Sequence, residues 1–65
     1  MNRNQVDYLI SVRHTVDAAL ASAIHEFALD NPLGAHEHVH TAKKHMTLLA
    51  GTIAFYALRK EGLIQ

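Results

Sequence analysis

Asp30-Asn31-Pro32-Leu33-Gly34 is the one stretch of this 65-residue chain where helix-breaking residues gather. Proline disfavours helical backbone at the residue before it, so Asn31 is expected to lie outside a helix. Asn31 can also cap a helix that starts at Pro32, where the missing N–H of proline costs nothing. We therefore predict a turn over residues 30–34 that separates two helices.

Apolar residues before the turn recur at intervals of three and four, which is the spacing of one helix face. This pattern predicts a helix over about residues 5–29, with Asn4 as its N-cap and Asp7 three residues on. The predicted apolar stripe consists of Val6, Leu9, Ile10, Val16, Leu20, Ala23, Ile24 and Phe27.

The segment after the turn predicts a second helix, over about residues 35–60. Arg59 and Lys60 suit the negative end of a helix dipole, and Gly62 is a suitable residue for ending the helix. Its apolar stripe has the alternating three- and four-residue spacing of coiled coils. The stripe consists of Val39, Ala42, Met46, Leu49, Ile53 and Tyr56.

Because the link is short, the two helices are predicted to be antiparallel neighbours in a single all-α domain over residues 1–65. Residues whose numbers sum to about 65 would then face each other, for example Leu20 and His45, or Phe27 and His38.

The second helix has more apolar surface than one partner helix can cover. Leu48, Phe55 and Leu58 fall on a different face from Leu49 and Ile53, and a helix that is apolar all round is buried. We therefore predict that the hairpin assembles into a homo-oligomeric helical bundle. A four-helix dimer is the simplest arrangement, and a trimer of dimers or another higher assembly fits equally well.

Composition excludes several classes of protein. Six acidic and six basic residues balance, whereas general nucleic-acid binding needs a basic footprint. The longest apolar run, Met46 to Leu58, is shorter than the ~20 residues of a membrane-spanning helix, and the N-terminus lacks the apolar core of a secretion signal. Cysteine is absent and no nucleophile–base pattern occurs. We predict a soluble, cytoplasmic protein that is not an enzyme, needs no cofactor and does not bind membranes.

Arg13 lies on the predicted apolar stripe of the first helix, between Leu9 and Val16. Asp17 stands four residues on and can pair with it. One interpretation is therefore a structural ion pair where the helices cross, opposite Thr52 and Tyr56. The other is a ligand-facing arginine between subunits, since arginine grips phosphate in a fixed fork.

Basic residues gather near the start of the second helix. His36, His40, Lys43 and Thr47 share one outward face, with Lys44 at its edge. A helix N-terminus attracts anions, so this face is either a phosphate-binding surface or a solvated polar face. His38 and His45 are predicted to flank the contact between the helices as half-buried residues.

A metal site is a further alternative. His36 and His40 stand at a spacing that can chelate a metal, and Glu37 with His40 forms the Glu-x-x-His unit of di-iron helical bundles. Glu26 could supply a carboxylate from the first helix. Glu26, Glu37 and His40 are expected to project away from the contact within the hairpin, so metal would bind between subunits.

Short motifs also occur in a characteristic order along the chain. They are Val6-Asp7 followed by Arg13, Asp30-Asn31-Pro32 at the turn, and then His45-Met46, Gly51, Arg59 and Glu61-Gly62. This order resembles the phage-encoded helical-hairpin sponges that sequester the cyclic-nucleotide messengers of bacterial immunity. The chain departs from that family at Thr47-Leu48-Leu49-Ala50, where the family has a Gln-rich polar stretch. The resemblance implies an oligomeric nucleotide binder without turnover, active in phage counter-defence.

The leading hypothesis is therefore a small oligomeric helical protein that binds an anionic small ligand, such as a cyclic nucleotide, between subunits. Phosphate contacts are predicted for Arg13 and for Lys43 or Lys44, a hydrogen bond for His40 or His45, and base stacking for Tyr8 or Tyr56. The alternatives are an interaction module that inhibits a host protein and a metal-binding bundle.

Overall fold

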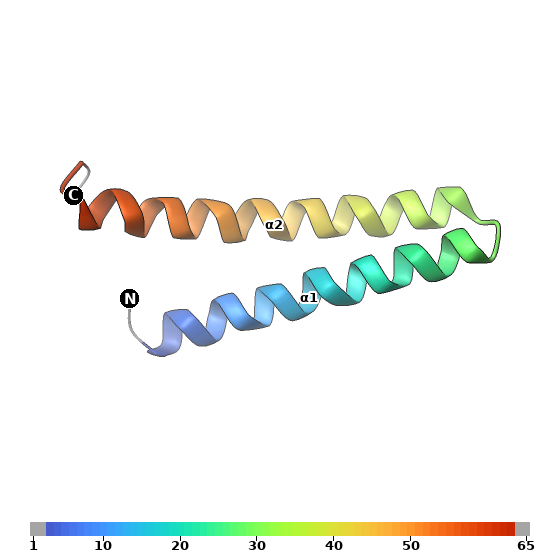
Figure 1. The fold of residues 1–65 in the computed structure, drawn as a ribbon, viewed down its shortest axis with the longest axis horizontal. Helices are drawn as coiled ribbons and strands as arrows, with labels where there is room; N and C mark the ends of the chain where they lie inside the picture. Colours follow the sequence, from blue (N-terminus) through green and yellow to red (C-terminus); the bar gives the residue numbers. More distant parts are fainter. Residues whose placement is uncertain (1–2, 64–65) are drawn as a thin grey trace.

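The chain folds as a two-helix hairpin, as predicted. A computed structural model describes residues 3–63, in which α1 spans Arg3–Ala28 and α2 spans Pro32–Lys60. The helices run antiparallel, with the turn at one end and both termini at the other (Figure 1). None of the helices in the described part of the chain is long and apolar enough to cross a membrane.

The turn is built from the ends of both helices. Asp30 takes a left-handed conformation, with φ 61°, which aspartate tolerates better than most residues. The Asp30 N–H donates to the Phe27 carbonyl at 3.1 Å, and the Asn31 N–H donates to the Glu26 carbonyl at 2.9 Å. These two bonds have the Schellman pattern, which satisfies the last carbonyls of a helix. The chain therefore reverses over fewer residues than the predicted 30–34.

Asn31 caps α2 with Pro32 in its first turn, which confirms the prediction. The Asn31 side-chain oxygen accepts from the Gly34 N–H at 3.2 Å, and its amide Nδ2 donates to Glu26 Oε2 at 2.8 Å. A Cβ on residue 34 would stand 2.6 Å from Asn31 Nδ2, so any other residue there would displace the Asn31 amide from this position. One side chain thus ties the end of α1 to the start of α2.

Replacing Asn31 with alanine is expected to lower the free energy of unfolding by about 1–2 kcal/mol. The cap accounts for roughly 1 kcal/mol of this, and the bond to Glu26 adds to it. Thermal unfolding followed by circular dichroism measures the loss. The matched control is Asn4→Ala, because Asn4 is exposed and lies inside α1, so its predicted role as an N-cap is wrong. Equal loss in both variants would contradict the role given to Asn31.

The other predicted helix end is also confirmed. α2 ends at Lys60, Glu61 is its C-cap, and Gly62 follows with φ 75°. The Gly62 N–H donates to the Arg59 carbonyl at 3.0 Å, and the Leu63 N–H donates to the Leu58 carbonyl at 2.9 Å. This is the same pattern as at the end of α1, here with glycine in the left-handed position.

The helices meet along one line of residues that repeats at alternating intervals of three and four, as in coiled coils. We call this line the seam. All of its members are buried or half-buried: Gln5, Leu9, Val12, Val16, Ala19, Ala23 and Glu26 on α1, and Ala35, His38, Ala42, His45, Leu49, Thr52 and Tyr56 on α2. Ser22 and Gly34, which lie beside the seam, are also half-buried.

The predicted register is therefore wrong. Val16, Ala19 and Ala42 form the packed core cluster, and Glu26 lies against Gly34, so facing residues sum to about 60 or 61 rather than 65. Leu20 and Phe27 are exposed instead of packing against His45 and His38. The tight turn fixes the register, and the alanines that it brings together let the helix backbones approach closely.

The core is small and lies toward the turn. The buried residues are Val12, Val16, Ala19, Ala23, Ala35 and Ala42, and no described residue after Ala42 is buried. Figure 1 shows α1 and α2 diverging from the turn toward the termini. Alanines line the seam near the turn, whereas Leu9, Leu49 and Tyr56 line its open end. The hairpin therefore leaves the apolar second half of α2 largely uncovered.

Candidate functional site

Large apolar side chains gather on one side of the seam. The residue after each seam position lies roughly 100° further around its helix. Since the helices are antiparallel, this rotation turns both helices' residues toward the same side of the hairpin. We call the surface they form the apolar face. Its large members are 38% to 72% exposed: Val6, Ile10, Leu20, Ile24 and Phe27 on α1, and Val39, Met46 and Ile53 on α2.

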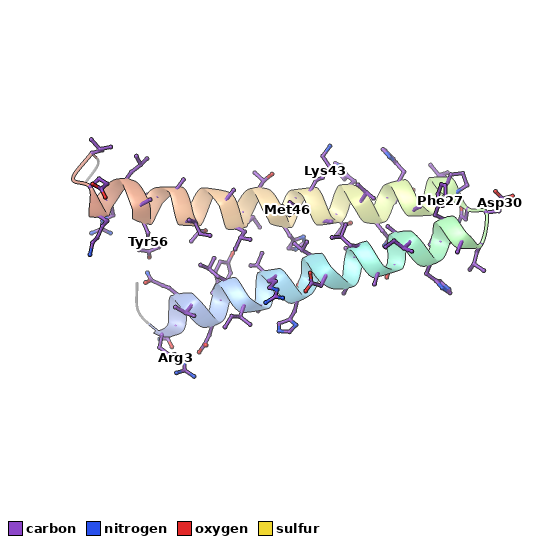
Figure 2. The ribbon with its side chains drawn as sticks, in the orientation of Figure 1. Arg3, Phe27, Asp30, Lys43, Met46 and Tyr56 are labelled. Carbon is purple, nitrogen blue, oxygen red and sulfur yellow. The ribbon has the colours of Figure 1, made fainter. Side chains whose placement is uncertain are left out.

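Three charged residues interrupt the apolar face near the middle of its length. Arg13 and Asp17 belong to this face on α1, and Lys43 belongs to it on α2; we call these three the central band. Arg13 Nε lies 3.6 Å from Asp17 Oδ2, and the Arg13 side chain is 77% exposed. The predicted ion pair therefore forms, but not at the helix crossing, because Thr52 and Tyr56 lie on the seam. In Figure 2, Lys43 lies on the side of α2 turned away from α1.

The opposite side of the hairpin has a different character. The residues before the seam positions are mostly polar in the half near the turn, where Thr15, Thr41 and Lys44 are exposed. At the open end the same side carries exposed Tyr8, Leu48 and Phe55. Lys43 and Lys44 are therefore neighbours in sequence but belong to opposite faces of the molecule.

The structure does not bring the predicted ligand-binding residues together within one chain. Arg13 and Lys43 share the apolar face, whereas Tyr8 and Lys44 lie on the opposite side. His45 and Tyr56 are half-buried in the seam, and His40 is exposed on the outer side of α2. No single side of the hairpin therefore carries more than two of these seven residues.

The basic residues at the start of α2 are exposed, as predicted. His36, His40, Lys43, Lys44 and Thr47 are all exposed, whereas His38 and His45 are half-buried. His45 Nδ1 lies 3.0 Å from the Thr41 carbonyl, and the Thr47 hydroxyl donates to the Lys43 carbonyl at 3.0 Å. Both of these polar groups thus contact carbonyls of their own helix.

The residues of the predicted metal site remain apart within one hairpin. Over residues 3–63, no group of three or more His, Asp or Glu side chains is placed to hold an ion. Glu26 is half-buried beside the turn and accepts from Asn31, so the expectation that it projects away from the seam is wrong. The arrangement leaves His36, Glu37 and His40 on exposed α2 surface.

An open hollow over Gly51 was not predicted. It is lined by Thr47, Leu48, Gly51, Thr52, Phe55 and Tyr56. Arg59 lies over the Phe55 ring at 5.6 Å, and the Phe55 and Tyr56 rings meet edge to face with centroids 5.4 Å apart. A Cβ on residue 51 would meet nothing within 4 Å, so the hairpin itself does not need glycine here. A second open hollow, lined by Lys43, Met46, Thr47 and Ala50, lies between the central band and the open end of the apolar face.

Fold and surface together define a class of protein, the two-helix hairpin with an uncovered apolar face. Comparison with protein-family models, curated proteins and solved structures found no match to this chain.

Proposed function

We propose that this hairpin is a subunit of a non-enzymatic homo-oligomer that binds an anionic small molecule between its subunits. The ligand class is a cyclic nucleotide, following the resemblance of the sequence motifs to the phage sponge proteins. The observation that carries the proposal is the apolar face with two cationic side chains at its centre.

Exposure of the apolar face supports the assembly. A large aliphatic or aromatic side chain contributes about 1.5–3 kcal/mol when it is fully buried. Eight such side chains are exposed on this face, while within residues 3–63 the buried core consists of two valines and four alanines. A domain of this size has only about 5–10 kcal/mol of stability. Burying the apolar face in an assembly would therefore contribute a free energy comparable to the whole stability of the hairpin.

The charges support an anionic ligand. Arg13 and Lys43 are cations on a surface that assembly would cover, and only Asp17 opposes them on the central band. Arginine and lysine bind phosphate groups, and they bind them more strongly where water is excluded. His36, exposed in the first turns of α2, adds a further donor near the turn end of the same face.

Calorimetry with a panel of cyclic mononucleotides and dinucleotides tests the ligand, using the purified oligomer. We expect saturable binding, and Arg13→Met is expected to weaken it at least tenfold, because an arginine–phosphate contact contributes about 1.5–3 kcal/mol. The matched control is Arg3→Met, which removes an exposed arginine that also pairs with an aspartate four residues on, at 3.4 Å. Absence of heat with every member of the panel would remove the nucleotide from the proposal.

A second candidate function is inhibition of a host protein through a helical surface. The observation that favours it is the second exposed apolar group, Tyr8, Leu48 and Phe55, on the side opposite the apolar face. This group stays uncovered when the apolar face alone pairs, so it could contact a different protein. A native mass that corresponds to a closed oligomer, in which both the apolar face and this second group are covered, would remove the support for this function.

A further inference from the structure

We infer that two hairpins pair through their apolar faces about a two-fold axis, and that the central bands then enclose a site for one doubly charged anion of the phosphate class. This inference rests on the proposed function and deepens it, because it names the partner, the residues and the charge of the ligand. Among cyclic nucleotides it selects the dinucleotides, whose two phosphodiesters carry two negative charges, over the mononucleotides, which carry one.

The position of the central band makes the face self-complementary. Arg13 and Asp17 lie near the middle of α1. Lys43 lies on α2 at the same level along the hairpin as Asp17, because their numbers sum to 60, as do those of Glu26 and Gly34, which lie against each other. Large apolar residues flank the band on both sides, so a two-fold rotation brings charge onto charge and apolar surface onto apolar surface. This holds whether the two turns lie at the same end or at opposite ends of the dimer.

Each arrangement supplies partners for the single acid. With the turns at one end, Asp17 faces Lys43 of the second copy across the interface. With the turns at opposite ends, Arg13 and Asp17 of the two copies pair reciprocally. A second copy is therefore complementary in charge as well as in apolar surface, which is the arrangement that favours an isologous dimer.

The area of the face suits a stable dimer. The hairpin measures 49 × 21 × 10 Å. Its broad side thus has a footprint of roughly 1,000 Å², compared with about 800 Å² per partner in standard protein interfaces. Arg3 and Lys60 lie at the open end of this side, where they would form part of a solvated rim.

The charges of the paired bands do not balance. Each copy brings two cations and one acid, so the middle of the dimer holds two surplus positive charges among apolar side chains. Charges removed from water in this way are costly unless they are neutralised. A doubly charged phosphate, or the two singly charged phosphodiesters of a cyclic dinucleotide, neutralises both, and phosphate oxygens match the donor geometry of arginine. Because only the dimer has the site, such an anion strengthens dimerisation by mass action.

Sedimentation equilibrium of the full chain measures this coupling. Inorganic phosphate at pH 7.5 is the probe, with sodium chloride at equal ionic strength as the reference and dimethyl phosphate as a singly charged control. We expect the dimer dissociation constant to fall at least tenfold in phosphate and to change little in dimethyl phosphate. An equal effect of all three solutes would overturn the anion site, as would no effect of phosphate on an intact dimer.

Lys43→Met tests the residue assignment. It removes both surplus charges, so we expect a tighter dimer in chloride and loss of the phosphate effect. Lys44→Met is the matched control, because the neighbouring lysine lies on the opposite side and should leave both quantities unchanged. If nucleotide binding persists but phosphate has no effect on dimerisation, this site is rejected and the proposed function stands. If phosphate affects dimerisation but no nucleotide binds, the site stands and the nucleotide is removed from the proposed function.

Discussion

Ile24→Asp is expected to weaken assembly of the hairpin by at least about 100-fold. Ile24 is 72% exposed in a single hairpin and lies on the apolar face, so most of its burial would come from the proposed second copy. Losing about 1.5–3 kcal/mol of burial from each of two copies corresponds to about 3–6 kcal/mol per dimer. Burying an unpaired carboxylate adds to this cost. Sedimentation equilibrium over a concentration series gives the change in dissociation constant.

The control for this variant is Ala21→Asp, which introduces the same charge on an exposed position of α1 that is not on the apolar face. We expect it to leave the native mass unchanged, because surface substitutions away from interfaces have small effects. A wild-type chain that is folded and monomeric at all concentrations would contradict the proposed dimer. Equal weakening by both variants would show that charge alone, and not the apolar face, governs assembly.

The hairpin and its turn were predictable because local chemistry determines them. Asn31 and Pro32 start a helix, Gly62 ends one, and the three- and four-residue spacing of apolar residues excludes strands. The bounds of both helices differ from the predicted ones by only a few residues. Even the pairing of Arg13 with Asp17 follows from helical spacing alone.

The face of each helix that packs against the other was not predictable in the same way. Both helices carry two series of apolar residues one position apart, which are the seam and the apolar face. The larger side chains belong to the apolar face, and they led to the wrong prediction of which residues pack between the helices. In the hairpin the smaller residues, such as Ala19 and Ala42, occupy the seam, because the tight turn fixes the register and alanines permit close approach. The larger residues, such as Ile24 and Phe27, remain for an outer surface.

This difference also explains why the candidate site could be predicted only in part. Arg13, Lys43, Lys44 and Tyr8 were selected by residue type, but their grouping depends on which side of the seam each one takes. A shift of one residue in the seam moves a side chain by roughly 100° around its helix. Lys43 and Lys44 are therefore not interchangeable, although the sequence offered them as alternatives.

Ala42→Leu is expected to have the largest effect of any conservative change on the hairpin itself, a loss of about 1–3 kcal/mol in the free energy of unfolding. Ala42 is the most buried of residues 3–63, at 1% exposure, and it packs with Val16 and Ala19 in the core between the helices. Three added carbons can fit only if the helices move apart, and overpacking of this kind costs about that amount. Such a loss is a large fraction of the stability of a small domain. Thermal and urea unfolding of the variant measure the change.

Ala54→Leu is the matched control, because Ala54 is exposed on α2 and does not lie on the seam. It adds the same three carbons at a helical position where they meet solvent, so we expect a change within about 0.5 kcal/mol. Ala42→Leu is also expected to affect the proposed dimer. Moving the helices apart at Ala42 widens the apolar face near Lys43, so a hairpin that tolerates leucine there would still be expected to pair less tightly. If Ala42→Leu unfolds at the wild-type temperature and keeps the wild-type dissociation constant, the close approach of α1 and α2 does not set the geometry of the face.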